Sequence, residues 1–158
     1  MTAIIRPYQP GDELGMAFAH SQSILQLCSR DYPAEAIVKW AVKKPEKYLR
    51  NSQQGETFWV AEQNDQIIGF AAWEKQELSG FYLHPEYVGQ GVGRRLFEVL
   101  EQDYRAKTNA TAWQLESTIT AKPFYEAMGF ATVAAATHTF RDGVTTIPVW
   151  KMLKTFVK

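Results

Sequence analysis

The sequence predicts an α/β (α+β) fold in which a mixed sheet carries helices on its faces. Segments with strand-like and helical periodicity follow each other in the order β, α, α, β, β, β, α, β, α, β, β, which is typical of layered proteins of this class. The chain has 158 residues with no internal repeat or linker, so residues 1–158 are expected to form a single domain. Hydrophobic residues make up 46% of the chain and aromatic residues 13%, which is enough for a sizeable core.

The first half of the chain holds three expected strands and two expected helices. Asp12 is a helix-capping residue type, and apolar residues at helical spacing follow it. Asn64 and Asp65 form a turn signal between two apolar runs, which indicates a hairpin. The expected elements are a strand at 4–8, a helix from 12 towards 28, a helix at 34–43, and strands at 57–62 and 67–74.

The second half begins with an aromatic strand that Pro85 ends. A glycine-rich turn leads from it into an amphipathic helix, and Gly129 stands where a glycine commonly ends a later helix. The expected elements are a strand at 78–84, a helix ending near 107, a strand at 113–116, a helix at 120–128, and strands at 130–140 and 144–153.

Composition argues against several classes of protein. The 17 basic and 17 acidic residues cancel, whereas nonspecific nucleic-acid binding needs an excess of cations. Cys28 is the one cysteine, so an intrachain disulfide is excluded. The chain starts without a signal peptide and contains no apolar run of about 18 residues. We therefore expect a cytoplasmic protein with no membrane and no nucleic-acid partner.

The glycine-rich turn is the most informative segment. Gly89, Gly91 and Gly93 remove every second side chain, so backbone N–H groups can approach an anion at the start of the next helix. Arg94 and Arg95 follow in the first helical turn, where cations oppose the helix dipole unless an anion binds there. The segment matches neither the dinucleotide-binding GxGxxG pattern nor a Walker-type loop. A tight turn that merely allows close packing is the alternative interpretation.

The segment 83–96 resembles the acetyl-CoA pyrophosphate loop of the GCN5-related N-acetyltransferase (GNAT) family. That family has Arg/Gln-x-x-Gly-x-Gly/Ala after a strand; here Val88 stands at the Arg/Gln position and Gly91-x-Gly93 completes the match. Val88 removes one polar side chain but leaves the backbone N–H groups. The resemblance implies that acetyl-CoA is the acetyl donor and that the following residues bind it: Leu83, Val88, Gly89, Gln90, Gly91, Gly93 and Arg94.

A second segment, 121–130, is similar to the family's later motif, which contains Phe-Tyr-x-x-x-Gly-Phe after an asparagine. Thr120 stands where that asparagine is common. The two motifs together imply one N-acetyltransferase domain with a largely antiparallel sheet of six to seven strands and helices on both faces. They also imply an amine acceptor, and they are compatible with a homodimer.

The resemblance assigns three catalytic roles. Tyr125 would protonate the leaving thiolate, because a phenol with a pKa of about 10 is protonated at neutral pH. The backbone N–H of Leu83 would polarise the thioester carbonyl. Glu77 would remove the amine proton, directly or through a water; Glu116 is the rival base, and His84 and His138 are further candidates.

The remaining expectations concern Cys28, metal binding and the acceptor pocket. Cys28 lies in an apolar helical pattern and is expected to be inert, and no His or Cys pair has the spacing of a metal site. The first helices and the last hairpin would supply the acceptor pocket with these residues: Tyr32, Trp40, Tyr48, His138, Arg141 and Trp150. Two other functions stay open: a noncatalytic acyl-CoA-binding sensor of the same fold, and an interaction module that binds a different nucleotide.

Overall fold

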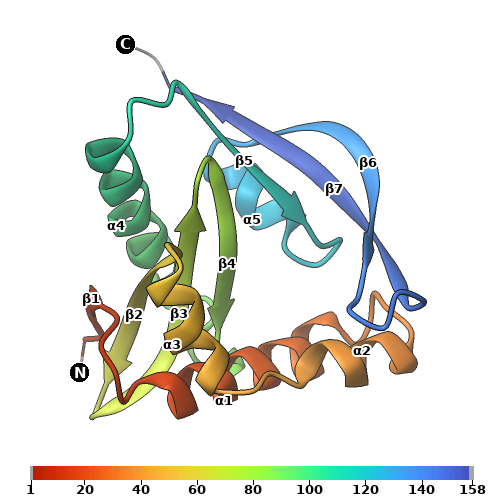
Figure 1. The fold of residues 1–158 in the computed structure, drawn as a ribbon, viewed down its shortest axis with the longest axis horizontal. Helices are drawn as coiled ribbons and strands as arrows, with labels where there is room; N and C mark the ends of the chain where they lie inside the picture. The colour runs from red at the N-terminus through yellow and green to blue at the C-terminus, as the bar shows by residue number, and fades with distance from the viewer. Residues whose placement is uncertain (1, 157–158) are drawn as a thin grey trace.

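A computed structural model describes residues 2–156 as a mixed α/β fold around one seven-stranded sheet (Figure 1). The strand order is β1-β2-β3-β4-β5-β7-β6. Every neighbouring pair is antiparallel except β4 and β5, which are parallel. The predicted mixed, largely antiparallel sheet is therefore confirmed. The strands are β1 (Ile4–Pro7), β2 (Thr57–Gln63), β3 (Gln66–Glu74), β4 (Glu77–Leu83), β5 (Ala112–Ser117), β6 (Ala131–Thr139) and β7 (Thr146–Thr155).

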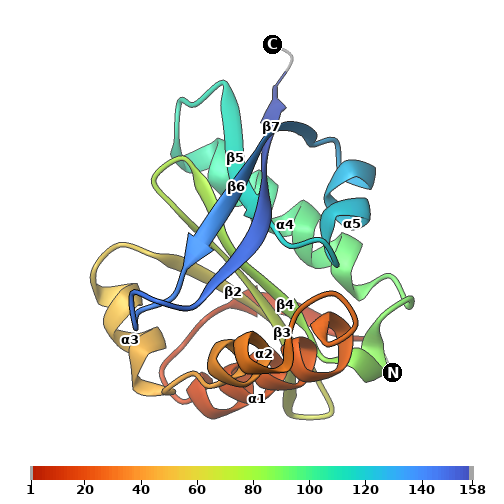
Figure 2. The same ribbon diagram turned by 90° about the vertical axis from the view of Figure 1, so that its right-hand side faces the viewer.

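Helices cover both faces of the sheet (Figures 1 and 2). They are α1 (Glu13–Ser23), α2 (Ala34–Ala41), α3 (Glu46–Gln53), α4 (Val92–Lys107) and α5 (Lys122–Ala127). A π-helical turn, η1 (Ile24–Cys28), continues α1, and a 3-10 turn, η2 (Pro85–Tyr87), precedes α4. None of the helices within residues 2–156 has the length and hydrophobicity to cross a membrane.

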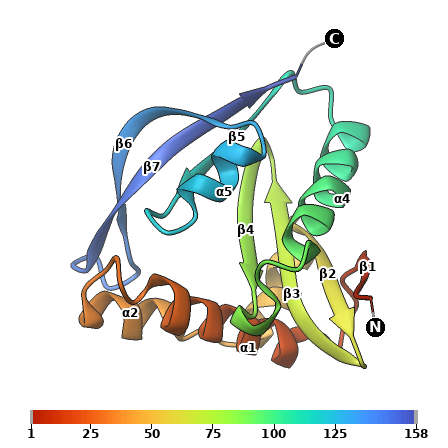
Figure 3. The ribbon, with the colours of Figure 1, turned by 180° about the vertical axis from the view of Figure 1, so that it is seen from behind.

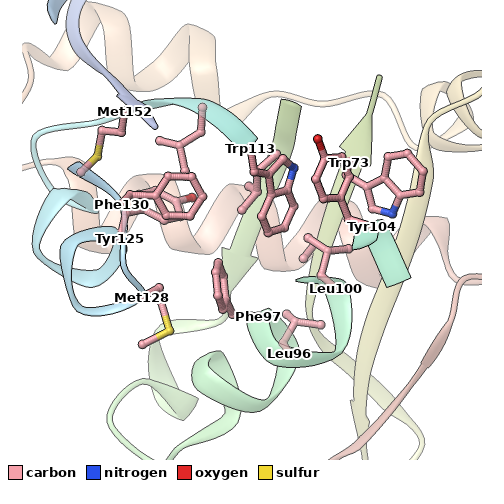
Figure 4. Close-up of a cluster of buried hydrophobic side chains, with 13 residues drawn as sticks. Trp73, Leu96, Phe97, Leu100, Tyr104, Trp113, Tyr125, Met128, Phe130 and Met152 are labelled. Carbon is pink, nitrogen blue, oxygen red and sulfur yellow. The ribbon is translucent and has the colours of Figure 1, made fainter. Parts of the chain in front are cut away.

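The alternation of side chains along β3 decides which helix packs on which face. Phe70 and Ala72 are buried in a cluster with residues of α1 and α3, whereas Ala71 and Trp73 belong to the cluster under α4 and α5. In that second cluster Trp113 stacks on Tyr104, with ring centroids 4.8 Å apart (Figure 4). Tyr125 and Phe130 lie at the other end of the same cluster.

Three expectations about individual elements were wrong in detail. Helix α3 was missed, because it has only eight residues and is held by one deeply buried side chain, Tyr48, between Phe58 and Phe70. The helix expected from 12 to 28 ends as the π-helical turn η1. The last strand begins and ends two residues later than predicted, at Thr146 and Thr155.

A β-bulge in β4 opens the centre of the sheet. Trp73 pairs with Leu78 and Ala72 pairs with Gly80, so Ser79 is the extra residue. Bulges bend and twist a strand, and β4 shares only one register pair with β5, Glu77 with Gln114. Beyond that pair the two strands diverge (Figure 3). This divergence positions the candidate site.

Candidate active site

A cavity of about 660 Å³ lies where β4 and β5 separate. Its walls come from both faces of the sheet: η1 and α2 on one face, α5 and the turn before α4 on the other, with β4, β5, β6 and β7 between them. The volume lies within the range of small-molecule binding sites. Most of the sequence-predicted site residues contribute to these walls, although they come from distant parts of the chain.

The edge of β4 offers free backbone N–H groups to this cavity. The N–H of His84 donates to the carbonyl of Ile68 at 2.7 Å, and Leu83 lies opposite Gly69. Successive residues of a strand point their N–H groups to opposite sides. The N–H of Leu83 therefore points away from β3, into the space that β5 has left.

The turn before α4 is shaped by two glycines in the left-handed region. Gly89 has φ +81° and Gly91, the N-cap of α4, has φ +85°. A Cβ atom at either position would meet none of the atoms of residues 2–156 within 4 Å, so these residues leave the space above the turn open. Gly93 differs, because it is helical and a Cβ there would touch the Phe124 ring at 3.5 Å. The turn thus leaves room for an anionic group beside the N-terminus of α4.

Some side chains of this turn line the cavity, and others bond to backbone carbonyls outside it. Val88, half exposed, and Arg94 line the cavity. Gln90 lies outside the lining, and its amide donates to the carbonyl of Glu86 at 2.9 Å. Arg95 also points elsewhere, because its guanidinium donates to the carbonyl of Ala3 at 2.8 Å. Only Arg94 of the two arginines is therefore available to an anion in the cavity.

Tyr125 reaches the cavity from α5. Its ring packs against Phe81 and Phe130, with centroids 6.3 and 6.0 Å away, and only 6% of its surface is exposed. No hydrogen bond of its hydroxyl to another group of residues 2–156 is seen. Burial raises the pKa of the Tyr125 phenol well above its usual value. The hydroxyl is therefore protonated and free to donate.

Two carboxylates and an imidazole line the cavity on the face that α1 and α2 cover. Burial raises the pKa of Glu77, and the charges of Glu116, Glu74 and Glu56 raise it further. Glu116 lies 3.9 Å from Nδ1 of His138, which is about half exposed. A raised pKa brings the Glu77 carboxyl group closer to neutral pH, and a general base works best when its pKa lies near the working pH.

His84 and Cys28 differ in their relation to the cavity. His84 caps η2, because its Nδ1 accepts the N–H of Glu86 at 3.2 Å, and it does not line the cavity. Cys28 lines the cavity but is buried, and burial raises the pKa of its thiol. A raised thiol pKa lowers the fraction of nucleophilic thiolate.

The residues expected to line an acceptor pocket fall into two groups. Trp40 and His138 line the cavity. Tyr48 is a core residue, and Arg141 and Trp150 lie outside the lining. Tyr32 is also outside: its hydroxyl accepts the N–H of Ile119 and donates to the carbonyl of Pro148, both at 2.8 Å. It thereby ties the segment before α5 to β7.

The wall residues missed at the sequence level include five large apolar ones: Ile24, Leu27, Tyr82, Ile147 and Val149. Their only signal was apolar periodicity, which does not distinguish a cavity wall from a packed core. Only the divergence of β4 and β5 exposes them to a common space.

Comparison with known proteins identifies the class. A family profile described as an acetyltransferase (GNAT) domain matches residues 28–153. The chain is 30% identical over 129 residues to the uncharacterized N-acetyltransferase YafP of Escherichia coli K12, covering 82% of this chain and 81% of that protein.

Two solved structures show the same fold. A GCN5-related N-acetyltransferase from Rhodopseudomonas palustris superposes with a TM-score of 0.89 at 25% identity, covering 99% of this chain and 97% of the other. The PaiA N-acetyltransferase of Thermoplasma acidophilum, in complex with coenzyme A, gives 0.79 at 22% identity, covering 99% and 100%.

These matches define an acyltransferase of the N-acetyltransferase class. The chain belongs to the GCN5-related N-acetyltransferase family, as its two motifs had indicated.

Proposed function

We propose that this protein transfers an acetyl group from acetyl-CoA to a primary amine, by direct attack of the amine in a ternary complex. The observation that carries the proposal is the shared cavity. It brings together the open glycine turn, the free edge of β4, a protonated phenol and a pair of carboxylates. Family membership supports the class of reaction.

The residues of the cavity fit acetyl-CoA. The open space above Gly89 and Gly91, the N-terminus of α4 and the Arg94 side chain suit a pyrophosphate. The free N–H groups of β4 suit an extended amide-bearing arm, which can pair with a strand edge. When bound, acetyl-CoA supplies a thioester that an amine can attack.

Each catalytic group acts at one atom. Glu77, directly or through a water, takes the proton of the incoming ammonium, since a protonated amine has no lone pair. The N–H of Leu83 donates to the thioester oxygen as negative charge develops there. The Tyr125 hydroxyl donates its proton to the sulfur as the C–S bond breaks, and it regains a proton from the nitrogen that has bonded to the acyl carbon.

Thiol release from acetyl-CoA, measured across a panel of amines, tests the proposal. We expect release that depends on both the enzyme and an amine, together with acetyl-CoA binding by calorimetry. Tight acetyl-CoA binding without turnover of any amine would instead support a noncatalytic sensor. Binding of ATP or NAD without binding of CoA would support a nucleotide-binding module.

A further inference from the structure

The cavity has two chemically different halves, separated by β4. The half beneath α5 holds the glycine turn and Tyr125. The other half lies on the face that α1 and α2 cover, because the register places Tyr82 opposite Phe70 on that face. Six apolar side chains gather in its wall: Ile24, Leu27, Trp40, Tyr82, Ile147 and Val149. Polar side chains, among them Ser23, Glu77, Glu116 and His138, line the remainder. We call the wall formed by the six apolar residues the apolar subsite.

The apolar subsite is held rigid by contacts around His20. The His20 ring packs edge-on against Tyr82 at 4.3 Å, and its Nε2 lies 2.8 Å from the carbonyl oxygen of Trp40. The Tyr82 ring also packs against Phe70 at 5.4 Å, and Trp40 packs against Tyr32 at 5.8 Å. Two aromatic walls are thus positioned before any ligand arrives, which reduces the ordering that binding requires.

The charged side chains of this half of the cavity lie mainly at one end. Glu77 and Glu116 lie there with His138, beside the bulge residue Ser79. Arg30, an exposed residue of the segment after η1, is the other charged side chain on this side. Neighbouring carboxylates attract an ammonium group and repel a carboxylate that is bonded close to it.

We propose that the acceptor is a primary amine carried on an apolar, ring-sized body, with no carboxylate on the carbon that bears the nitrogen. The ammonium lies at the Glu77 and Glu116 end, and the apolar body fills the apolar subsite. This inference rests on the proposed function. It goes beyond it by naming the acceptor class, which distinguishes this site from one for polyamines or lysine side chains.

Four amines test the acceptor class: 2-phenylethylamine, methylamine, L-phenylalanine and spermidine. A hydrophobic pocket discriminates by about 10- to 200-fold for each missing methylene, so we expect kcat/KM for 2-phenylethylamine at least 100-fold above that for methylamine. We expect it at least tenfold above those for L-phenylalanine and spermidine. If L-phenylalanine or spermidine is the better acceptor, the inference is wrong, although the enzyme is still an acetyltransferase. If no amine reacts while acetyl-CoA binds, the proposed function itself fails.

Two variants on α2 separate the subsite from general damage. Trp40→Ala removes a wall, and we expect KM for 2-phenylethylamine to rise at least tenfold with acetyl-CoA affinity unchanged by calorimetry. Val38→Ala is the matched control, because Val38 lies on the same helix, is 61% exposed and does not line the cavity. Equal effects of the two substitutions on KM would overturn the proposal.

A third variant tests the apolar character directly. Leu27→Glu places a carboxylate in the subsite wall, and we expect the preference to shift by at least tenfold from 2-phenylethylamine towards spermidine. An unchanged ratio of the two kcat/KM values would show that the acceptor's body does not reach this wall.

Discussion

Replacing Tyr125 with phenylalanine separates catalysis from stability. The side chain is buried, and no hydrogen bond of its hydroxyl to another group of residues 2–156 is seen. Phenylalanine keeps the ring contacts with Phe81 and Phe130. Because no protein hydrogen bond is lost, the free energy of unfolding should change by less than about 0.5 kcal/mol.

The kinetic effect of the same substitution should be far larger. Loss of a general acid lowers a rate by about 10²- to 10⁴-fold, which corresponds to roughly 2.7–5.4 kcal/mol in the activation free energy. We expect that loss in kcat, with KM for acetyl-CoA changed less than threefold. Because burial raises the pKa of Tyr125, the wild-type phenol stays protonated through the usual assay range and adds no alkaline limb below about pH 10.

The assay is thiol release at saturating acetyl-CoA and amine, with thermal melting of both proteins in the same buffer. A kcat within threefold of wild type would refute the assignment of Tyr125 as the acid. A large fall in Tm would refute the premise that the hydroxyl makes no structural contact.

Three further predictions concern other parts of the molecule. Gly91→Ala should lower Tm by about 3–6 °C, because a side chain at φ +85° costs about 1–2 kcal/mol. Gly93 is helical, so Gly93→Ala should change Tm by less than about 2 °C, and equal shifts of the two variants in thermal melts would contradict this. Glu77→Gln should lower kcat/KM at pH 7 about 100-fold and abolish the acid limb of the pH–rate profile, whose midpoint lies above the ordinary glutamate pKa. Glu116→Gln should change kcat/KM less than tenfold, and a larger effect of Glu116→Gln than of Glu77→Gln would make Glu116 the base. Burial lowers the pKa of His20 to about 4, so the unfolded chain takes up a proton before the folded chain does as pH falls. The free energy of unfolding should therefore be full above about pH 6.5 and fall by on the order of 3 kcal/mol towards pH 4. Urea unfolding at pH 7.5 and 4.5 should show a smaller fall in His20→Gln than in the wild type, and an equal fall would assign the effect to other groups.

The order of elements could be predicted from the sequence because the strands and long helices carry strong periodic patterns and clear boundaries. Pro85 and Gly129 mark real ends, and α4 begins at the glycine turn. Helix α3 escaped prediction because its stability comes from Tyr48 in the tertiary core rather than from a local apolar stripe.

The two halves of the candidate site differ in how predictable they were. The turn and Tyr125 lie in contiguous motifs, so their residues could be named in advance. The apolar subsite is assembled from residues far apart in sequence, and it exists because the bulge at Ser79 lets β4 and β5 diverge. Arg95 was misleading for a similar reason, since its partner, the Ala3 carbonyl, lies 92 positions away.

The most direct test of the account follows the acetyl group itself. The protein is incubated with acetyl-CoA labelled in the acetyl carbon and with 2-phenylethylamine or another amine of the panel, and the products are analysed by mass spectrometry. We predict labelled N-acetyl amine in an amount equal to the CoA released, with no label on the protein. Label that accumulates on the protein would contradict direct transfer, and bound acetyl-CoA without labelled amine from any acceptor would contradict the proposed enzyme.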